Sequence, residues 1–393
     1  MRILFNIIFS AILVIGLVGF WALFLNLWKP KKKWPAWVGY IIIIGAWFAA
    51  IRYYILNQVD LYGTMYYPLM NLFRTESYGF LFGLFLAIPV FIVLGLLYWA
   101  VNKIWSKTPE ENRTGRRAFF RTAATVVPLA TIGSSSYAAY VGQHEIEVTH
   151  ESFGYTNLPP GLKDYKIVQL SDIHVGPSID LDDLDEILKL ALVEKPNRVV
   201  ITGDLIDKLA WLPQVCERLT TFAKQIPDGV DFILGNHEYH HDVNKVLDEL
   251  KHNTPMNILV NSNIQIMGGK QPVYIAGVAY DNDREKEKRE AMIDRALSGI
   301  PDYAFVILLA HHPEFFEEAI ERKIPLTLSG HTHGGQIVFM GMPLVPTGTP
   351  YTKGRYVEEQ SVCYVNNGSG HWFPIRINCP REITVITFFD GVA

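Results

Sequence analysis

The chain has 393 residues, enough for two domains of ordinary size, and 49% of them are hydrophobic, a high fraction for a purely soluble protein. The net charge of -4 averages over two unlike halves, and neither half is a basic domain that would bind nucleic acid. Cys216, Cys363 and Cys379 form no CxxC pair, which argues against a structural zinc module and against a disulfide-built scaffold. Cys363 and Cys379 could pair only if their domain faced an oxidising compartment.

The N-terminal part of the chain contains four long uncharged stretches. Each is close to the roughly 20 residues that cross a bilayer. We predict a membrane region over residues 1–144 with about four helices, at 3–28, 35–56, 78–101 and 119–142. The fourth stretch contains Pro128 and many Ala, Ser and Thr residues, so its transfer into lipid is the least favourable. The middles of the spans lack Asp, Glu, Lys and His, which favours an anchor over a transporter.

Basic residues predict the orientation of this region. They gather in the first and third loops, as Lys29, Lys31, Lys32 and Lys33 and as Lys103, Lys107, Arg113, Arg116, Arg117 and Arg121. By the positive-inside rule both loops are cytoplasmic, which places both termini and everything after residue 145 outside the cytoplasm. The third loop is also similar to a twin-arginine export signal, which leads to the same side. If the fourth stretch does not cross, the domain faces the cytoplasm instead.

From residue 145 the composition changes to short apolar runs that alternate with polar helical stretches. This alternation predicts a layered α/β or α+β sandwich over residues 145–393. Strands are expected at 166–170, 198–202, 231–234, 273–276, 305–310, 326–329, 362–365 and 383–388. Helices are expected at 181–194, 212–225, 243–251 and 314–322.

Polar segments follow the expected strands directly. They are SDIHVG at 171–176, TGDLID at 202–207, GNHE at 235–238, AHHP at 310–313 and GHTHGGQ at 330–336. Ligand sites of open α/β sheets form beyond the carboxyl ends of strands, so we expect these segments to converge on one rim. In an extended segment, residues two apart share a face. Asp172 with His174, and His331 with His333, are therefore each expected to aim two donors at one point.

This set of side chains is typical of metal ligands. Oxygen and imidazole donors without thiolate suit divalent ions such as Mn, Fe, Zn, Co or Ni. The donors are too many for one ion, so we expect two ions about 3.5 to 4 Å apart. Two carboxylates and a bridging hydroxide against two such ions would leave about one net positive charge, which favours a phosphate anion.

The ordered set DIH, GD, GNHE, H and GHTH resembles the pattern of the calcineurin-like metallophosphoesterases, over roughly residues 163–390. The resemblance implies a four-layer α/β sandwich and a two-metal centre. It implies that one ion is held by Asp172, His174, Asp204 and His333, and the other by Asp204, Asn236, His311 and His331. Asp204 would bridge the ions. His237 would contact the phosphate and protonate the leaving group.

Some positions depart from that pattern or leave a choice. Glu238 stands where many members of the family have Asp, which puts its orienting role in doubt. Of the adjacent His311 and His312, only one is expected to be a ligand, and the family pattern selects His311. His240 and His241 are interpreted as loop residues. The stretch 364–382 resembles the closing segment of membrane-associated bacterial members and is interpreted as structural.

Together these observations predict a multi-pass, membrane-anchored, two-metal phosphoesterase with an extracytoplasmic catalytic domain. It would hydrolyse phosphomonoester, phosphodiester or pyrophosphate bonds, with Asp204 and His237 in catalytic roles, and its substrate would be an envelope or lipid-linked phosphate. One alternative is a cytoplasm-facing lipid-precursor pyrophosphohydrolase. Another is an inactive membrane-tethered binding protein, whose mark would be a lost metal ligand.

Overall fold

A computed structural model describes residues 61–104, 110–279, 285–344, 346–371, 373 and 375–391. The chain divides into two compact units between Val141 and Gly142. The predicted spans at 3–28 and 35–56 lie outside the described residues.

The first unit contains two long helices, α3 (Tyr67–Ile104) and α4 (Glu110–His144), of which α4 extends into the second unit. Within the described residues, one segment, Phe85–Ile104 of α3, is long and apolar enough to cross a membrane. The fourth predicted span lies within α4, which does not meet that criterion. One of the predicted spans is thus supported, and the multi-span anchor stays a prediction.

The two helices pack closely at glycines of α3. A Cβ atom at Gly83 would lie 2.5 Å from the backbone of Ile132, and one at Gly79 would lie 2.6 Å from the backbone of Ser136. Small residues four apart that let backbones approach in this way are common between membrane helices.

The second unit is built on two six-stranded sheets. The first sheet has the order β1 (Ile146–Tyr155), β14 (Arg381–Asp390), β2 (Ile167–Leu170), β3 (Arg198–Ile201), β4 (Val230–Phe232) and β5 (Asn257–Ile258). The second has the order β12 (Gly354–Glu358), β13 (Ser361–Val365), β9 (Leu326–Ser329), β8 (Phe305–Ala310), β7 (Val273–Val278) and β6 (Ser262–Met267). A small hairpin joins β10 (Val338–Phe339) to β11 (Met342–Pro343).

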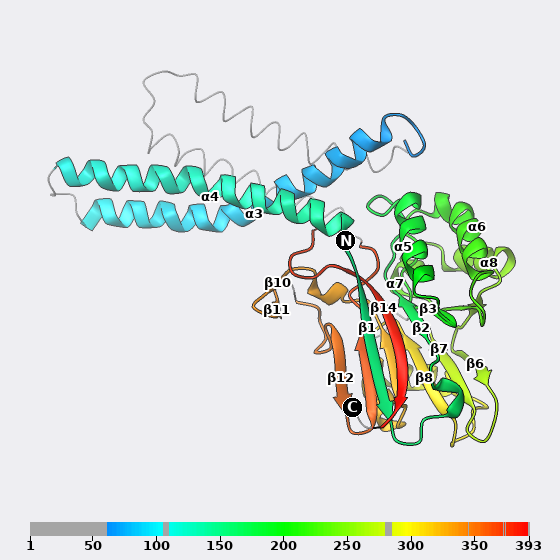
Figure 1. Ribbon diagram of the computed structural model, residues 1–393. Coiled ribbons are helices and arrows are strands. Elements are labelled where there is room, and N and C mark those ends of the chain that lie inside the picture. The colour runs from blue at the N-terminus through cyan, green and yellow to red at the C-terminus, as the bar shows by residue number, and fades with distance from the viewer. Residues whose placement is uncertain are drawn as a thin grey trace. The chain divides into compact units, whose positions relative to one another are not determined.

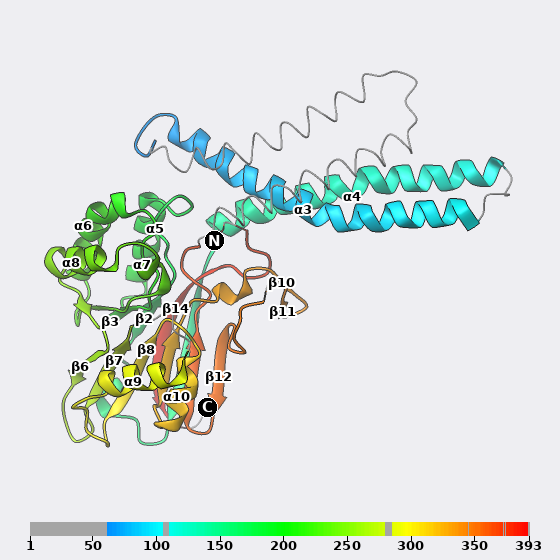
Figure 2. The ribbon, with the colours of Figure 1, turned by 180° about the vertical axis from the view of Figure 1, so that it is seen from behind.

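Helices cover the outer face of each sheet (Figures 1 and 2). The first sheet is covered by α5 (Leu181–Val193), α6 (Leu212–Ala223) and α8 (Val243–Asn253), and the second by α9 (Lys286–Ala296) and α10 (Phe315–Glu321). The short helix α7 (Asn236–His240) follows β4, and the 3-10 turns are η1 (Pro160–Leu162), η2 (Leu209–Trp211) and η3 (His333–Gly335). The order of helices, sheet, sheet and helices is a four-layer sandwich.

Strand β8 packs against the layers on both of its faces. Its residues Ile307 and Leu309 pack in the core between the sheets, whereas Val306, Leu308 and Ala310 pack in a second core beneath α9 and α10. Alternate side chains of a strand point to opposite faces, and a parallel strand covered on both faces reads as a continuous apolar run. The sequence FVILLA has this pattern.

The predicted strands and helices are present with small shifts at their ends, but several elements were not predicted. Strand β1 is a parallel edge strand whose side chains are mostly half-buried, so its sequence IEVTHESFGY lacks a long apolar run. Helix α9 buries only Ile293 and Ala296, so its highly charged sequence gives little periodic signal. An edge strand such as β1 is fixed by its pairing with β14 more than by its own sequence pattern.

Candidate metal centre

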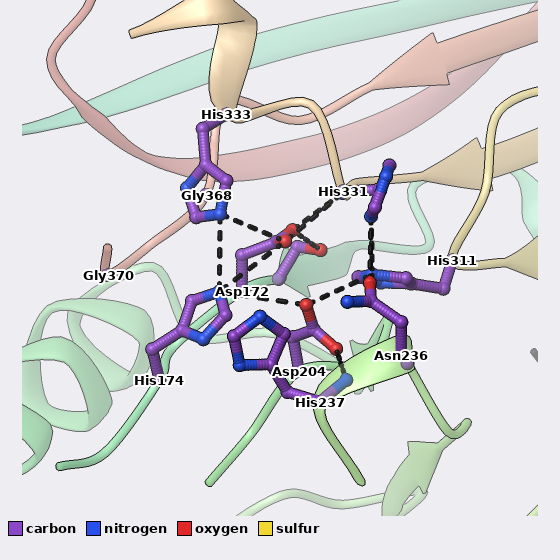
Figure 3. A network of polar contacts seen from close by, with 12 residues as sticks. Asp172, His174, Asp204, Asn236, His237, His311, His331, His333, Gly368 and Gly370 are labelled. Carbon is purple, nitrogen blue, oxygen red and sulfur yellow. Dashed lines mark hydrogen bonds and ion pairs between the residues drawn. The ribbon is translucent and has the colours of Figure 1, made fainter. Parts of the chain in front are cut away.

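Five loops after strands of both sheets converge at one end of the sandwich (Figure 3). Backbone bonds join the first two loops, since Asp172 N–H donates to Gly203 O at 3.0 Å and His174 N–H donates to Asp204 O at 2.9 Å. The loop after β9 joins them, because His331 N–H donates to the carboxylate of Asp172 at 2.9 Å. The loops are therefore held together before any ligand is considered.

The backbone at this rim is strained. Five of the predicted ligands have positive φ although none is glycine: Asp172 at 51°, His174 at 55°, Asp204 at 53°, His331 at 71° and His333 at 50°. Left-handed backbone costs a non-glycine residue roughly 1 to 2 kcal/mol, and such strain clusters at functional sites. The expectation that paired ligands project from extended segments is wrong, because these turns and not strand alternation aim the side chains.

A first group of donors consists of Asp172, His174 and His333, all buried. The Nε2 atoms of His174 and His333 lie 3.2 Å apart. Asp172 Oδ1 lies 3.4 Å from His333 Nε2 and 3.9 Å from His174 Nε2. These separations match the distances between ligand atoms around one ion bound at about 2.0 to 2.2 Å.

A second group consists of Asp204, His311 and His331, with Asn236 beside it. His311 Nε2 lies 3.2 Å from Asp204 Oδ2 and 3.1 Å from Asn236 Oδ1. His331 Nδ1 lies 2.9 Å from Asn236 Oδ1. His331 and His333 thus belong to different groups, so the expectation that they aim at one point is also wrong. The ligand assignment that the resemblance implies uses this same division and remains a prediction.

These donors fit divalent metal ions. His311 Nδ1 donates to the carbonyl oxygen of Thr202 at 2.7 Å, which leaves the lone pair of Nε2 facing the group. Pairs of imidazole nitrogens 3.2 to 3.3 Å apart, next to buried carboxylates, need a proton or a cation between them. Imidazole and carboxylate donors without thiolate suit the borderline divalent ions.

Asp207 was not among the predicted site residues, yet it contacts three histidines. Its Oδ1 lies 2.5 Å from His237 Nδ1, 3.4 Å from His174 Nδ1 and 3.7 Å from His241 Nε2. Burial would raise the pKa of Asp207, but the imidazoles of His174 and His237 hold it well below its usual value. An ionised Asp207 therefore keeps a proton on Nδ1 of His237. The only sequence signal was a second acidic residue in the segment TGDLID.

His237, which belongs to α7, lies beside the two donor groups (Figure 3). Its backbone N–H donates to Asp204 Oδ1 at 2.8 Å. Burial would lower the pKa of His237, but the bond to Asp207 and the charge of Asp204 raise it to about 9. A dication bound nearby would act against this increase. The imidazole is thus equipped by its own surroundings to hold a proton at neutral pH.

Glu238 supports the loop that carries Asp204. Its carboxylate is fully buried and accepts backbone N–H groups of Asp204 at 3.0 Å, Leu205 at 2.8 Å and Gly235 at 2.7 Å. The longer side chain, whose orienting role the sequence left in doubt, therefore reaches the backbone of two loops at once. A buried carboxylate that accepts several backbone N–H groups stabilises the conformation of the loop through charge-assisted hydrogen bonds.

We expect Glu238→Gln to lower the free energy of unfolding by about 1 to 3 kcal/mol, because an amide N–H₂ would face N–H donors in a buried site. Denaturant unfolding of the purified full chain measures the change. The matched control is Glu217→Gln, at an exposed position of α6. Equal midpoints for the two variants would show that Glu238 does not support the loops.

Arg376 is another site neighbour that the sequence left as structural. It is buried, and its Nη2 donates to the carbonyl oxygens of Asn367 at 2.9 Å and Gly370 at 2.8 Å. The same nitrogen lies 3.3 Å from His333 Nδ1. Arg376 therefore ties the closing segment 364–382 to the loop of His333.

The remaining histidines and the cysteines take separate places. His312 packs its ring against that of His331, with centroids 3.8 Å apart, and does not join either donor group. His240 is the last residue of α7, so its interpretation as a loop residue is wrong, whereas His241 follows the helix as its C-cap. The rings of both lie near that of His237. All three cysteines are free and buried, so Cys363 and Cys379 do not pair. Cys379 instead points its thiol at the backbone carbonyl of His333.

Comparisons with known proteins agree with this geometry. A family model described as calcineurin-like phosphoesterase matches residues 165–335. An uncharacterized metallophosphoesterase of Campylobacter jejuni is 36% identical over 58% of this chain and 60% of its own length. A transmembrane protein with metallophosphoesterase domain from Danio rerio is 32% identical over 58% of this chain and 54% of its own length. The uncharacterized metallophosphoesterase YkuE of Bacillus subtilis is 31% identical, over 70% of this chain and 98% of its own length.

This chain spans little more than half the length of some of these relatives, but it spans nearly all of the Bacillus protein. The matched region contains both sheets' central strands and all five loops of the rim. The chain therefore belongs to the calcineurin-like phosphoesterases, a family of metal-dependent hydrolases of phosphoester bonds.

Proposed function

We propose that the chain hydrolyses phosphoester bonds at a centre of two divalent ions bridged by Asp204. One observation carries the proposal. Asp204 Oδ2 lies 3.7 Å from His174 Nε2 in the first donor group and 3.2 Å from His311 Nε2 in the second. A carboxylate oxygen that lies near imidazoles of both groups could bind both ions at once. The proposed ligands are Asp172, His174, Asp204, Asn236, His311, His331 and His333.

The bound ions, His237 and Asp207 would then have different roles in hydrolysis. Two bound cations would supply positive charge for the phosphate and activation of the attacking water. Since Nδ1 of His237 is bonded to Asp207, its Nε2 is left to face the substrate. From there the protonated ring would donate to the leaving oxygen as a general acid, which is commonly worth 10²- to 10⁴-fold in rate. Asp207 would hold the ring and stabilise its charged form.

Hydrolysis by the purified full chain tests the proposal. The chain is stripped with a chelator, reloaded with Mn, and assayed against an aryl phosphomonoester, an aryl phosphodiester and a lipid diphosphate. We expect metal-dependent release from at least one substrate, and none from the stripped chain. Hydrolysis that does not respond to chelation and reloading would reject the metal centre, and inactivity on all three would favour a binding protein.

We further propose that the enzyme is anchored in the cell membrane, with its catalytic unit outside the cytoplasm and an envelope or lipid-linked phosphate as substrate. The apolar segment Phe85–Ile104 and the transmembrane relative support the anchoring. The orientation is supported by the basic residues near the end of α3 and in the first part of α4, which are Lys103, Arg113, Arg116, Arg117 and Arg121. If α4 did not cross, the unit would face the cytoplasm and lipid precursors there.

Labelling from outside intact cells distinguishes these orientations. We expect an impermeant maleimide to label Tyr303→Cys, an exposed position of the second unit, before lysis. Ala118→Cys, at an exposed position in the basic first part of α4, should be labelled only after lysis. The native cysteines are buried and give a low background. The reverse pattern would place the catalytic unit in the cytoplasm.

A further inference from the structure

An apolar hairpin, β10–β11 with Leu344, follows the loop that carries His331 and His333. Its side chains are exposed, at 58% for Phe339, 83% for Met340, 65% for Met342 and 62% for Leu344. The sequence has no Asp, Glu, Lys or Arg between Lys323 and Lys353. A contiguous exposed patch of this kind marks a surface that contacts a partner or a membrane.

The turn at the tip of the hairpin contains a residue that turns of this type disfavour. Phe339 pairs with Met342, so Met340 and Gly341 form a two-residue turn, and both have positive φ, at 50° and 81°. Such turns favour Asn-Gly or Asp-Gly, because a side chain like that of Met is strained there. An apolar side chain is therefore kept at the tip against the preference of the backbone.

The base of the hairpin is fixed while its tip is free. Leu344 N–H donates to Ile337 O at 2.8 Å, Val338 N–H donates to Ile377 O at 2.9 Å, and Asn378 Nδ2 donates to Val338 O at 3.1 Å. The hairpin is thus braced against the closing segment that Arg376 ties to His333. Its position relative to the candidate metal centre is therefore defined.

The chain enters the second unit at this same end of the sandwich. Ile146, the first residue of β1, pairs with Arg381, the first residue of β14. Because β14 runs antiparallel to β2, both strands start beside the carboxyl end of β2, where Asp172 follows. Both ribbon views place β10, β11 and α7 at this end (Figures 1 and 2). The point of chain entry, the rim and the hairpin tip share one end.

We propose that the hairpin tip inserts into the interface of a lipid bilayer and seats the rim on it, so that phosphoesters held in the bilayer reach the metal centre. The inference rests on the proposed function, since an anchored enzyme meets such substrates. Bulky apolar side chains on an uncharged element suit insertion at the boundary of headgroups and acyl chains. Ile146, where the chain enters β1, lies at this same end of the unit.

Lipid quenching tests the insertion directly. The full chain, with Met340→Cys carrying an environment-sensitive fluorophore, is placed in phosphatidylcholine–phosphatidylglycerol nanodiscs. We expect blue-shifted emission that nitroxide-labelled lipids quench. The control is Tyr303→Cys, 64% exposed and just before the amino end of β8, which should give unshifted, unquenched emission. Equal signals at both positions, or crosslinking of position 340 to a second copy without lipid quenching, would overturn the proposal.

Activity tests the role of the contact. A variant with Phe339, Met340, Met342 and Leu344 all replaced by Ser should hydrolyse a lipid diphosphate in vesicles about tenfold more slowly or worse, because apolar area that enters the interface is lost. Its rate on a soluble aryl phosphodiester should stay unchanged, as should both rates of the control Val357→Ser. Equal losses on both substrates would overturn the proposal.

These outcomes separate the two proposals. If the wild-type chain hydrolyses neither substrate, the proposed function fails, whereas the quenching result still decides the insertion. If it hydrolyses the soluble substrate but position 340 is not quenched, the insertion fails and the proposed function stands.

Discussion

Asp204→Asn is expected to abolish metal binding and activity together. The Asp204 carboxylate lies close to imidazoles of both donor groups, and an amide in its place removes the negative charge that two neighbouring cations would share. A loss of several kcal/mol of electrostatic stabilisation corresponds to a fall in rate of about 10³-fold or more. Metal content by elemental analysis and phosphate release are measured on the same sample.

The matched control is Asp180→Asn. Asp180 is also buried, but it caps α5 by accepting the N–H groups of Asp182 and Asp183. Asn caps a helix about as well as Asp, so this variant should keep metal and rate. If Asp204→Asn also kept both, Asp204 could not be the bridging ligand.

His237→Ala is expected to fail differently, with both ions kept and the rate reduced by roughly 10²- to 10⁴-fold. The loss should be smaller for an aryl ester with a strongly acidic phenol, because such a leaving group needs little protonation. Asp207→Asn should show the same dependence on leaving group with a smaller loss, since it removes the partner of the ring and not the ring itself. Rates on two esters and metal content are compared for each variant.

The exposed His252 on α8, whose Nδ1 lies 2.7 Å from the carbonyl of Asp248, provides the control. His252→Ala should match the wild type on both esters. An empty centre in His237→Ala, or equal losses on good and poor leaving groups, would remove the general-acid assignment.

The rim illustrates what the sequence can predict. The loops were recognisable because each places polar residues directly after an apolar strand, as in SDIHVG after β2. The geometry that aims Asp172 and His174 was not recognisable, because left-handed backbone in non-glycine residues has no local signal. It is imposed by bonds between loops, such as that from His174 N–H to Asp204 O.

Supporting residues were harder to predict than the expected ligands. Asp207 and Arg376 act on histidines that lie far from them in sequence or on another loop, so only the folded chain brings them together. Glu238 was noticed as a departure from a family pattern, but its bonds to four backbone N–H groups depend on how two loops meet. Helix α9 and strand β1 were not predicted because few of their residues are buried, so their sequences show little apolar periodicity.

The number of metal ions per chain tests the proposed two-metal centre. The purified full chain is loaded with Mn or Zn, freed of excess metal and analysed for metal and protein, with activity measured on the same sample. We expect about two ions per chain at full activity. One ion per chain under saturating metal, with full activity, would contradict it.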